Sequence, residues 1–427
     1  MNLTKEFSSS TLAEWQEKIT KDLKGGTLEE LIWQSELGPI DPVLFDYKNK
    51  YQRIDAHQNN DDNTWEIAQT FNCSNPHKAN KEILSSLAGG VNYIQLINIK
   101  ATDIATVLSE VMVEIITTKI YHEVEDLKDF ENATANYPAG SIHLLVDPIG
   151  CYVAGYIPTA SPISSKCVVR SSIFEGAGAS FQNQIGMTVS LAHEYLLQLM
   201  QNGMDKTTAA KNIFFEISIG NSYFAEIAKL RAFRTLWNSV LELYEITFTD
   251  MNIHAVTSSF YQSNLDVHNN LLRGTTAAMA SCIAGVNSLE VLTYDNQLTE
   301  KQSDGSRLSK NISLILQEEA YLNQVKNAAN GSYYIEQLTD IIIEKSWEVI
   351  KEVEAEGGFM QSFESEKLQT KIANDLNHKI SQFKNEELIL VGTNRQPNKN
   401  EKNTENYASP EHGKFIKSYR LAQTKLS

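Results

Sequence analysis

Cysteine is scarce in this chain of 427 residues, and the four that occur show no CxxC spacing: Cys73, Cys151, Cys167 and Cys282. Neither a disulfide framework nor a zinc knuckle is indicated, and buried free thiols are the simpler interpretation. No stretch approaches the roughly 18 consecutive apolar residues of a membrane-spanning helix. The first residues, MNLTKEFSSS, also lack the basic and apolar regions of a secretory leader. We therefore expect a cytoplasmic protein.

Positive charge is also in short supply. The chain has 37 Lys and Arg against 53 Asp and Glu, which leaves a formal net charge of −16. Such a chain repels polyphosphate backbones and anionic membrane surfaces, so we expect neither nucleic acid nor a membrane as partner. Hydrophobic residues make up 42% of the sequence, which is enough for a large globular core.

Short catalytic motifs are missing as well. The stretch HEYLL at 193–197 nearly matches the zinc motif HExxH, but Leu197 stands where the second imidazole ligand is needed. Gly176 and Gly178 supply half of a G-x-G-x-x-G dinucleotide fingerprint, and Phe181 takes the third glycine position, where its bulk would block close helix packing. The sequence contains no G-x-S-x-G elbow and no Walker loop. We therefore expect no metal site, and we interpret the glycines as a turn between a strand and a helix.

Short β-branched and apolar runs alternate with helical patterns from about Gly90 onward. Seven such runs predict strands, at 93–99, 119–124, 142–147, 167–174, 213–219, 254–258 and 289–294. Helical patterns lie near 102–115, 126–133, 181–201, 221–244, 269–286, 306–322 and 335–355. This alternation predicts a parallel sheet connected by crossover helices. With a short eighth strand near Val325, a (β/α)8 barrel of the TIM type fits better than a doubly wound sheet, although sequence separates these two folds poorly.

The helix predicted at 221–244 illustrates the pattern. Its apolar residues, from Tyr223 to Tyr244, mostly follow one another at steps of three and four and form one stripe that could cover a barrel wall. Lys229, Arg231 and Arg234 fall outside the stripe, so we expect them to face solvent, an ion pair or an anion.

The two ends of the chain differ in composition from its centre. Residues 1–85 are polar and irregular with a few large anchors, such as Trp15 and Trp33, and we interpret them as an N-terminal arm that contacts a partner subunit. Residues 86–390 form the predicted barrel. Residues 391–427 have little to bury, and we expect a polar, flexible C-terminal tail.

Three long stretches together resemble the barrel portion of the methylmalonyl-CoA mutase family, and within it the smaller, non-catalytic chain of heterodimeric bacterial enzymes. They are IFFEISIGNSYFAEIAKLRAFRTLW (213–237), TSSFYQSNLDVHNNLLRGTTAAMASCIAGVNSLEV (257–291) and ILQEEAYLNQVKNAANGSYYIEQLTDIIIEKSWEVIKEVEAEGGF (315–359). STLAEWQEKITKDLKGG (10–26) is similar to the family's N-terminal arm. The likeness covers most of residues 10–390 and is more specific than any short motif.

This resemblance implies a (β/α)8 barrel, through whose axis acyl-CoA passes in the catalytic chains of the family, and a cobalamin domain over the carboxyl ends of the strands. Adenosylcobalamin supplies a radical there, and succinyl-CoA and (R)-methylmalonyl-CoA are interconverted. A cobalamin domain needs on the order of 100 residues, whereas only a short polar stretch follows the last helical pattern. We therefore expect this chain to carry no cobalamin domain of its own. DVHNNL at 266–271 resembles the family's D-x-H-x-x-G element, but Leu271 replaces the glycine, and we interpret His268 as a helix-start or packing residue.

Position by position, the resemblance implies that the catalytic side chains are absent. Thr70 stands where catalytic chains carry a tyrosine beside the reacting carbons. Ser172 and Ile173 replace a Tyr-His pair whose imidazole would hydrogen-bond the thioester carbonyl, and Leu265 takes the glutamine position of a T-x-Q-D-P segment. Among the residues that contact CoA in the family, Arg231 alone matches clearly. It is either a remnant of CoA binding or part of a structural ion pair.

The expected function is that of the non-catalytic β subunit of an adenosylcobalamin-dependent methylmalonyl-CoA mutase, stabilising the catalytic α subunit in a heterodimer. The partner would bind adenosylcobalamin and this chain no cofactor, so the chain would be inactive by itself within an isomerase complex. The alternative is a cobalamin-independent barrel enzyme, or a degenerate binding protein, acting on an acyl-CoA or a small acid. Its candidate residues are Glu175, Arg231, Lys229 and His143, whose spacing supports no particular constellation.

Overall fold

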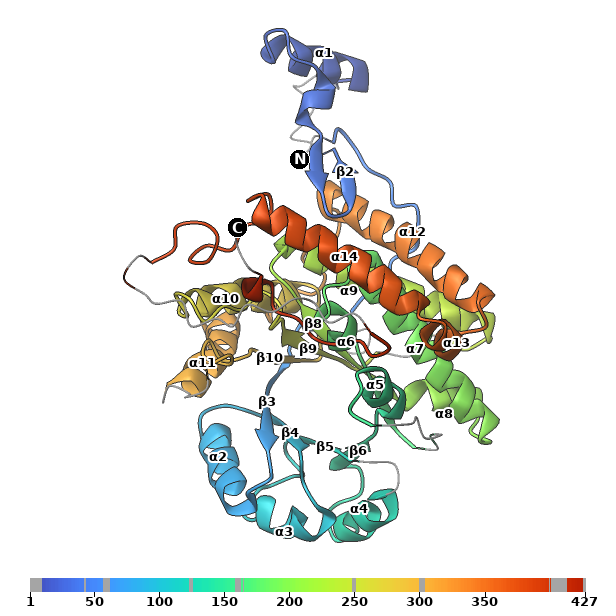
Figure 1. Ribbon diagram of the computed structural model, residues 1–427, viewed down its shortest axis with the longest axis vertical. Coiled ribbons are helices and arrows are strands. Elements are labelled where there is room, and N and C mark those ends of the chain that lie inside the picture. Colours follow the sequence, from blue (N-terminus) through green and yellow to red (C-terminus); the bar gives the residue numbers. More distant parts are fainter. Residues whose placement is uncertain are drawn as a thin grey trace, which may run out of the picture.

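A single parallel sheet of eight strands organises the chain (Figure 1). The computed structural model describes residues 10–41, 44–56, 62–122, 126–157, 163, 165–247, 251–298, 304–398, 400 and 413–424. The strands are β3 (Glu66–Asn72), β4 (Tyr93–Ile97), β5 (Thr117–Tyr121), β6 (Ile142–Leu145), β7 (Cys167–Arg170), β8 (Ile213–Ile219), β9 (Ile253–Thr257) and β10 (Ser288–Glu290). Their order in the sheet is β6-β5-β4-β3-β10-β9-β8-β7.

The sheet closes on itself. Its edge strands, β6 and β7, meet through a parallel bridge between Val146 and Cys167, and the amide of Val168 donates to the carbonyl oxygen of Val146 at 3.0 Å. Consecutive strands are neighbours and are joined by helical connections, with β10 beside β3. The predicted (β/α)8 barrel is therefore confirmed.

The eighth strand is not where we predicted it. Val325 lies in an exposed turn, whereas Glu66–Asn72, which we assigned to the N-terminal arm, forms β3 and pairs with β4 and β10. The barrel thus begins before the expected boundary at residue 86. Polar and apolar residues are mixed in the sequence of β3, EIAQTFN, because several of its side chains face a polar barrel interior. It therefore lacks the apolar run by which we recognised the other strands.

Helices surround the barrel and form most of the apolar core with it. They are α2 (Pro76–Ala88), α3 (Ile104–Val107), α4 (Leu127–Thr134), α5 (Pro148–Val153), α6 (Ser172–Glu175), α7 (Phe181–Gln201), α8 (Lys206–Lys211), α9 (Tyr223–Leu243), α10 (Asn269–Ile283), α11 (Gly305–Glu318), α12 (Tyr333–Ala355), α13 (Phe359–Glu364) and α14 (Lys367–Lys384). Among the described residues, no helix is both long enough and apolar enough to cross a membrane.

Helix α9 is more enclosed than its sequence indicated, because it packs against α7, α10 and α12. Lys229, Arg231 and Arg234 are consequently buried, so the solvent-facing alternative is wrong, whereas the ion-pair alternative is confirmed for Lys229 and Arg231. Each has polar partners instead. Lys229 pairs with Glu226 at 2.5 Å, and Arg234 donates to the carbonyl oxygen of Ala284 at 2.8 Å.

The N-terminal arm projects from one end of the molecule (Figure 1). It contains α1 (Leu12–Asp22), the 3-10 helix η1 (Leu28–Leu31) and an antiparallel hairpin of β1 (Trp33–Ser35) and β2 (Gly38–Ile40). Thr11 caps α1 together with Glu14. None of the residues of α1 is buried, and the ring of Trp15 contacts that of Phe45 with centroids 5.6 Å apart.

Residues 413–424 of the C-terminal segment are packed against the barrel, which differs from the flexible tail that we expected. Residues 413–424 lie across the barrel face on which the strands end: the amides of Ile416, Tyr419 and Leu421 donate to the carbonyl oxygens of Val153, Gly176 and Phe260 at 2.8, 2.7 and 3.0 Å. Ile416, Tyr419 and Leu421 are buried by this contact. Residues 401–412 of the predicted tail lie outside the described part of the chain.

Candidate functional site

A cavity of about 1150 Å³ opens where the barrel strands end. Its walls come from all eight strands of the barrel and the loops that follow them, and they combine apolar side chains such as Ile67, Leu145 and Leu289 with polar groups. In a (β/α)8 barrel this end carries the loops from which binding sites are built. The cavity is therefore the candidate site.

A chain of hydrogen bonds runs along one wall of the cavity, over the neighbouring strands β5, β4, β3 and β10. The hydroxyl of Thr70 donates to Glu290 Oε2 at 2.6 Å and its amide donates to Oε1 at 2.9 Å. Gln95 donates to the Thr70 hydroxyl at 3.0 Å and accepts from the Tyr121 hydroxyl at 2.8 Å. Burial alone would raise the pKa of Glu290, but the nearby His254, whose Nε2 lies 3.8 Å from Oε2, and the hydrogen bonds from Thr70 hold it below its usual range. The carboxylate is thus kept ionised by its neighbours.

A second polar group lies where β6 and β7 end. Arg170 Nε contacts Asp147 Oδ2 at 2.6 Å, and the Tyr195 hydroxyl donates to the other carboxylate oxygen at 2.6 Å. Burial by itself lowers the pKa of Arg170, but the Asp147 carboxylate outweighs it and raises that pKa. Nearby, the hydroxyl of Ser172 donates to Glu216 Oε1 at 3.2 Å. The charges of Arg170 and Asp147 thus neutralise each other.

Below the cavity, buried side chains fill the barrel axis. The Nζ atom of Lys119 on β5 lies 4.9 Å from the ring centroid of Tyr93 on β4 and 4.6 Å from that of Phe214 on β8. Tyr93 in turn stacks on His254 of β9 at 5.0 Å. Because these four strands are distributed around the barrel, their side chains meet across its axis. Burial lowers the pKa of Lys119 to about 7.

The charge of the cavity opposes CoA. Its lining includes six acidic residues, Glu82, Asp126, Asp147, Glu216, Glu290 and Asp295, against two strongly basic ones, Arg170 and Lys310. A ligand that carries several phosphate charges would be repelled by this excess of carboxylates. A filled axis and an acidic mouth both disfavour the passage of an acyl-CoA.

The positions that the family resemblance singled out are not all at the cavity. Thr70 lines it, and Ser172 contacts one of its lining residues, Glu216. Ile173 packs in part against the main core, and the amide of Leu265 donates to the hydroxyl of Ser263 at 3.0 Å; neither side chain lines the cavity. The lack of a catalytic role for these four residues stays a prediction.

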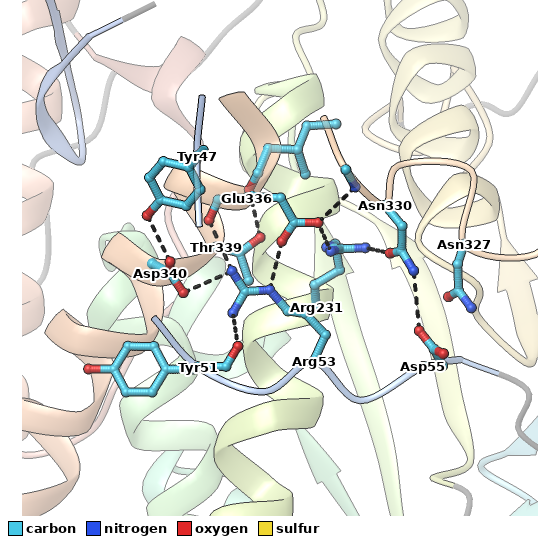
Figure 2. A network of polar contacts seen from close by, with 12 residues as sticks. Tyr47, Tyr51, Arg53, Asp55, Arg231, Asn327, Asn330, Glu336, Thr339 and Asp340 are labelled. Atoms are coloured by element: carbon cyan, nitrogen blue, oxygen red, sulfur yellow. Dashed lines mark hydrogen bonds and ion pairs between the residues drawn. The ribbon is translucent and has the colours of Figure 1, made fainter. Parts of the chain in front are cut away.

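Arg231 is not among the residues that line the cavity, and its guanidinium contacts α12. Its Nη2 contacts Glu336 Oε1 at 2.6 Å, and its Nη1 donates to Asn330 (Figure 2). Of the other residues considered for an independent enzyme, Glu175 and Lys229 both contact Ser218, whose carbonyl oxygen accepts from Lys229 Nζ at 2.7 Å. Glu175 accepts from the hydroxyls of Ser218 and Ser258, and His143 lies beside Lys166, 3.2 Å from Nδ1 to Nζ.

The glycine turn is a packing feature. Gly178 has φ +92°, and a Cβ placed there would lie 2.7 Å from Leu376 Cδ1 on α14. Asp375 of the same helix accepts from the amide of Ser180 at 2.7 Å and from Asn183 Nδ2 at 2.7 Å. A built-in carboxylate thus occupies the N-terminus of α7, the position at which a phosphate would bind in a phosphate-binding loop.

The most polar cavity residues were missed by sequence reasoning: Gln95, Tyr121, Asp147, Arg170, Glu216 and Glu290. A signal was available in β8, IFFEISI, where one carboxylate interrupts an apolar strand. Such a residue in a strand covered by helices on its outer face must face the barrel interior. Among the described residues, no group of His, Cys, Asp and Glu is placed to hold a metal ion.

Comparison with known proteins points to one family. The sequence profile described as methylmalonyl-CoA mutase matches residues 127–425. The chain is similar to the methylmalonyl-CoA mutase small subunits of Porphyromonas gingivalis (29% identity over 93% of this chain and 71% of that protein) and Propionibacterium freudenreichii (24%, over 86% and 65%). It is also similar to the methylmalonyl-CoA mutase of Rhizobium meliloti (28%, over 64% and 39%). It thus spans about two thirds of the small subunits' length and much less of the Rhizobium protein.

Proposed function

Since this chain belongs to the methylmalonyl-CoA mutase family, we propose that it is the non-catalytic β subunit of an adenosylcobalamin-dependent methylmalonyl-CoA mutase. The observation that carries this proposal is its similarity to named small subunits over 86–93% of its length. In this role the chain stabilises a catalytic α subunit, which interconverts succinyl-CoA and (R)-methylmalonyl-CoA. A small subunit implies a larger partner.

The state of the barrel supports an inactive chain. Thr70 is engaged by Glu290 and Gln95, so a bulkier tyrosine at this position would displace two hydrogen-bonded neighbours. The acidic mouth and the filled axis disfavour an acyl-CoA ligand, which also argues against the alternative of an independent enzyme for CoA esters or small acids.

The described residues do not fit a resident cobalamin. His268, in the stretch that resembles D-x-H-x-x-G, stacks on Tyr294 with ring centroids 5.1 Å apart, and Leu271 packs in part against the core. We therefore assign adenosylcobalamin to the partner.

The N-terminal arm supports a partner-binding role. Leu12, Trp15 and Ile19 lie at helical spacing on α1, yet none of them is buried in this chain, and Trp33 on β1 is 54% exposed. Residues 10–26 carry three acidic and three basic side chains, so this segment is neutral although the chain has a net charge of −16. A neutral helix does not repel a partner through net charge, whatever the sign of that partner's charge. We assign the apolar stripe of α1 to the α subunit.

Purification with and without the partner tests the proposal. The chain is produced alone and together with the large mutase chain from the same organism, and turnover of succinyl-CoA is measured with added adenosylcobalamin. We expect the pair to co-purify and to be active, and the chain alone to show neither turnover nor cobalamin uptake. Turnover by the isolated chain, or separate elution of the two chains, would contradict the proposal.

A further inference from the structure

The segment that follows the arm is attached to the barrel by a buried ion-pair network (Figure 2). Arg53 contacts Glu336 Oε2 through Nε and Asp340 Oδ1 through Nη2, both at 2.8 Å. Arg231 contacts the other oxygen of Glu336 at 2.6 Å. We call these four residues, Arg53, Arg231, Glu336 and Asp340, the clamp.

The clamp joins three parts of the chain that are distant in sequence: the segment 44–56, α9 and α12. The side chain of Arg53 is 10% exposed and that of Asp340 is fully buried, and two positive charges face two negative ones. Taking such charges out of water largely cancels their attraction, so a buried network of this kind adds little net stability, and a role in fixing one arrangement is its best-supported use.

The clamp fixes the course of the segment 44–56 along α12. The hydroxyl of Tyr47 and the amide of Lys50 both donate to Asp340 Oδ2, at 2.7 and 2.9 Å. At the other end, Asp55 accepts from Asn330 Nδ2 at 3.3 Å (Figure 2). This segment contains no helix or strand, so these side-chain contacts replace the backbone pairing that positions regular elements.

Through this segment the clamp reaches α1. Phe45 lies two residues before Tyr47, and its ring is the one that contacts Trp15 of α1. The hairpin tip is attached separately, because Lys345 donates to the carbonyl oxygen of Leu37 at 2.7 Å and Lys379 contacts Glu36 at 3.1 Å. The arm is therefore held at two places, and the Trp15–Phe45 contact connects α1 to the one that contains the clamp.

We propose that the clamp presets α1 for docking to the partner, with Arg53 as a positioning residue that contacts no part of the partner itself. This inference rests on the proposed function, since it assumes that α1 binds the α subunit. A docking helix that is already oriented loses less conformational freedom on binding than a mobile one, so the partner binds more tightly.

The test uses a charge-balanced variant of the full chain. Arg53→Met combined with Asp340→Asn removes one cation and one anion together, so no buried charge is left without compensation. Spin labels at Gln16→Cys on α1 and Glu348→Cys on α12 report the distance distribution in the free chain, and titration calorimetry reports the affinity for the large mutase chain. The matched control is Lys50→Met with Glu344→Gln, an exposed pair on the same two segments.

We expect the double variant to stay folded, to broaden the distance distribution and to weaken the partner's affinity by roughly tenfold or more, while the control changes neither. A narrow distribution in the double variant, or a broad one with unchanged affinity, would overturn the inference. If the wild-type chain does not bind the large chain, the proposed function fails, and the distance distribution still shows separately whether the clamp positions α1.

Discussion

At the scale of single residues, the buried amine of Lys119 makes stability depend on pH. Burial lowers its pKa from 10.5 to about 7. Between these values the unfolded chain holds a proton that the folded chain does not, so the free energy of unfolding rises with pH from about 7 to 10.5 on account of this residue. Below pH 7 the folded state keeps a charged amine in the barrel axis.

Lys119→Met removes this charge. We expect the variant to be more stable than the wild type by about 1–3 kcal/mol at pH 6, and the difference to shrink or reverse near pH 10, where the wild-type amine is neutral. Urea unfolding at both pH values measures it, with the exposed Lys50→Met as control. Parallel pH profiles for wild type and Lys119→Met would show that the amine is not responsible.

Thr70 carries the hydrogen bonds that distinguish this cavity. Thr70→Val keeps the shape of the side chain but leaves Glu290 and Gln95 without the hydroxyl between them, so we expect a loss of about 1–3 kcal/mol in the free energy of unfolding. Thr370→Val removes an exposed hydroxyl on α14 and should cost much less. Equal losses in the free energy of unfolding for the two variants would mean that the hydrogen bonds of Thr70 stabilise the fold no more than those of an exposed threonine.

Sequence reasoning identified Thr70 and Ser172 at or beside the cavity only through a family resemblance, and it missed Glu290 and Gln95. The reason is physical. Periodicity reports which side chains are apolar, and a barrel with a polar interior hides its inward residues among those that face solvent. Similarly, the sequence allowed an ion pair for Arg231 but could not identify Glu336 as its partner, because Glu336 lies 105 residues away on α12.

At the scale of elements, the contact between the glycine turn and α14 can be tested with a matched pair. Gly178 and Gly203 have nearly the same φ, +92° and +90°, but an added Cβ meets Leu376 at Gly178 and nothing within 4 Å at Gly203. We expect Gly203→Ala to cost about 1 kcal/mol from backbone strain and Gly178→Ala about 2–4 kcal/mol, because α14 must also move. Equal costs in urea unfolding would contradict this packing.

The elements also show where sequence patterns succeed. Strand β8, which is apolar on both faces, and the long helix α7 were predicted with their exact bounds, and α9 was predicted to within two residues at each end. Strand β3 was missed because its interior face is polar. The packing of the C-terminal segment was missed because its three large buried side chains, Ile416, Tyr419 and Leu421, are spread through a polar stretch. Short segments that dock on a finished barrel have no periodicity of their own to detect.

At the scale of the whole molecule, the chain forms a complete barrel whose mouth is lined by carboxylates and whose axis is filled by buried side chains. An arm with an exposed apolar helix projects from one end of the same molecule (Figure 1). These features fit a subunit whose contribution is a binding surface, with substrate bound elsewhere in the complex.

The most direct measurement is the stoichiometry of substrate binding by the complex. Titration calorimetry of succinyl-CoA into the purified pair of chains, with adenosylcobalamin bound, should give one ester per pair, and the isolated chain should give no binding. Two esters per pair, or binding of succinyl-CoA to this chain alone, would contradict the account.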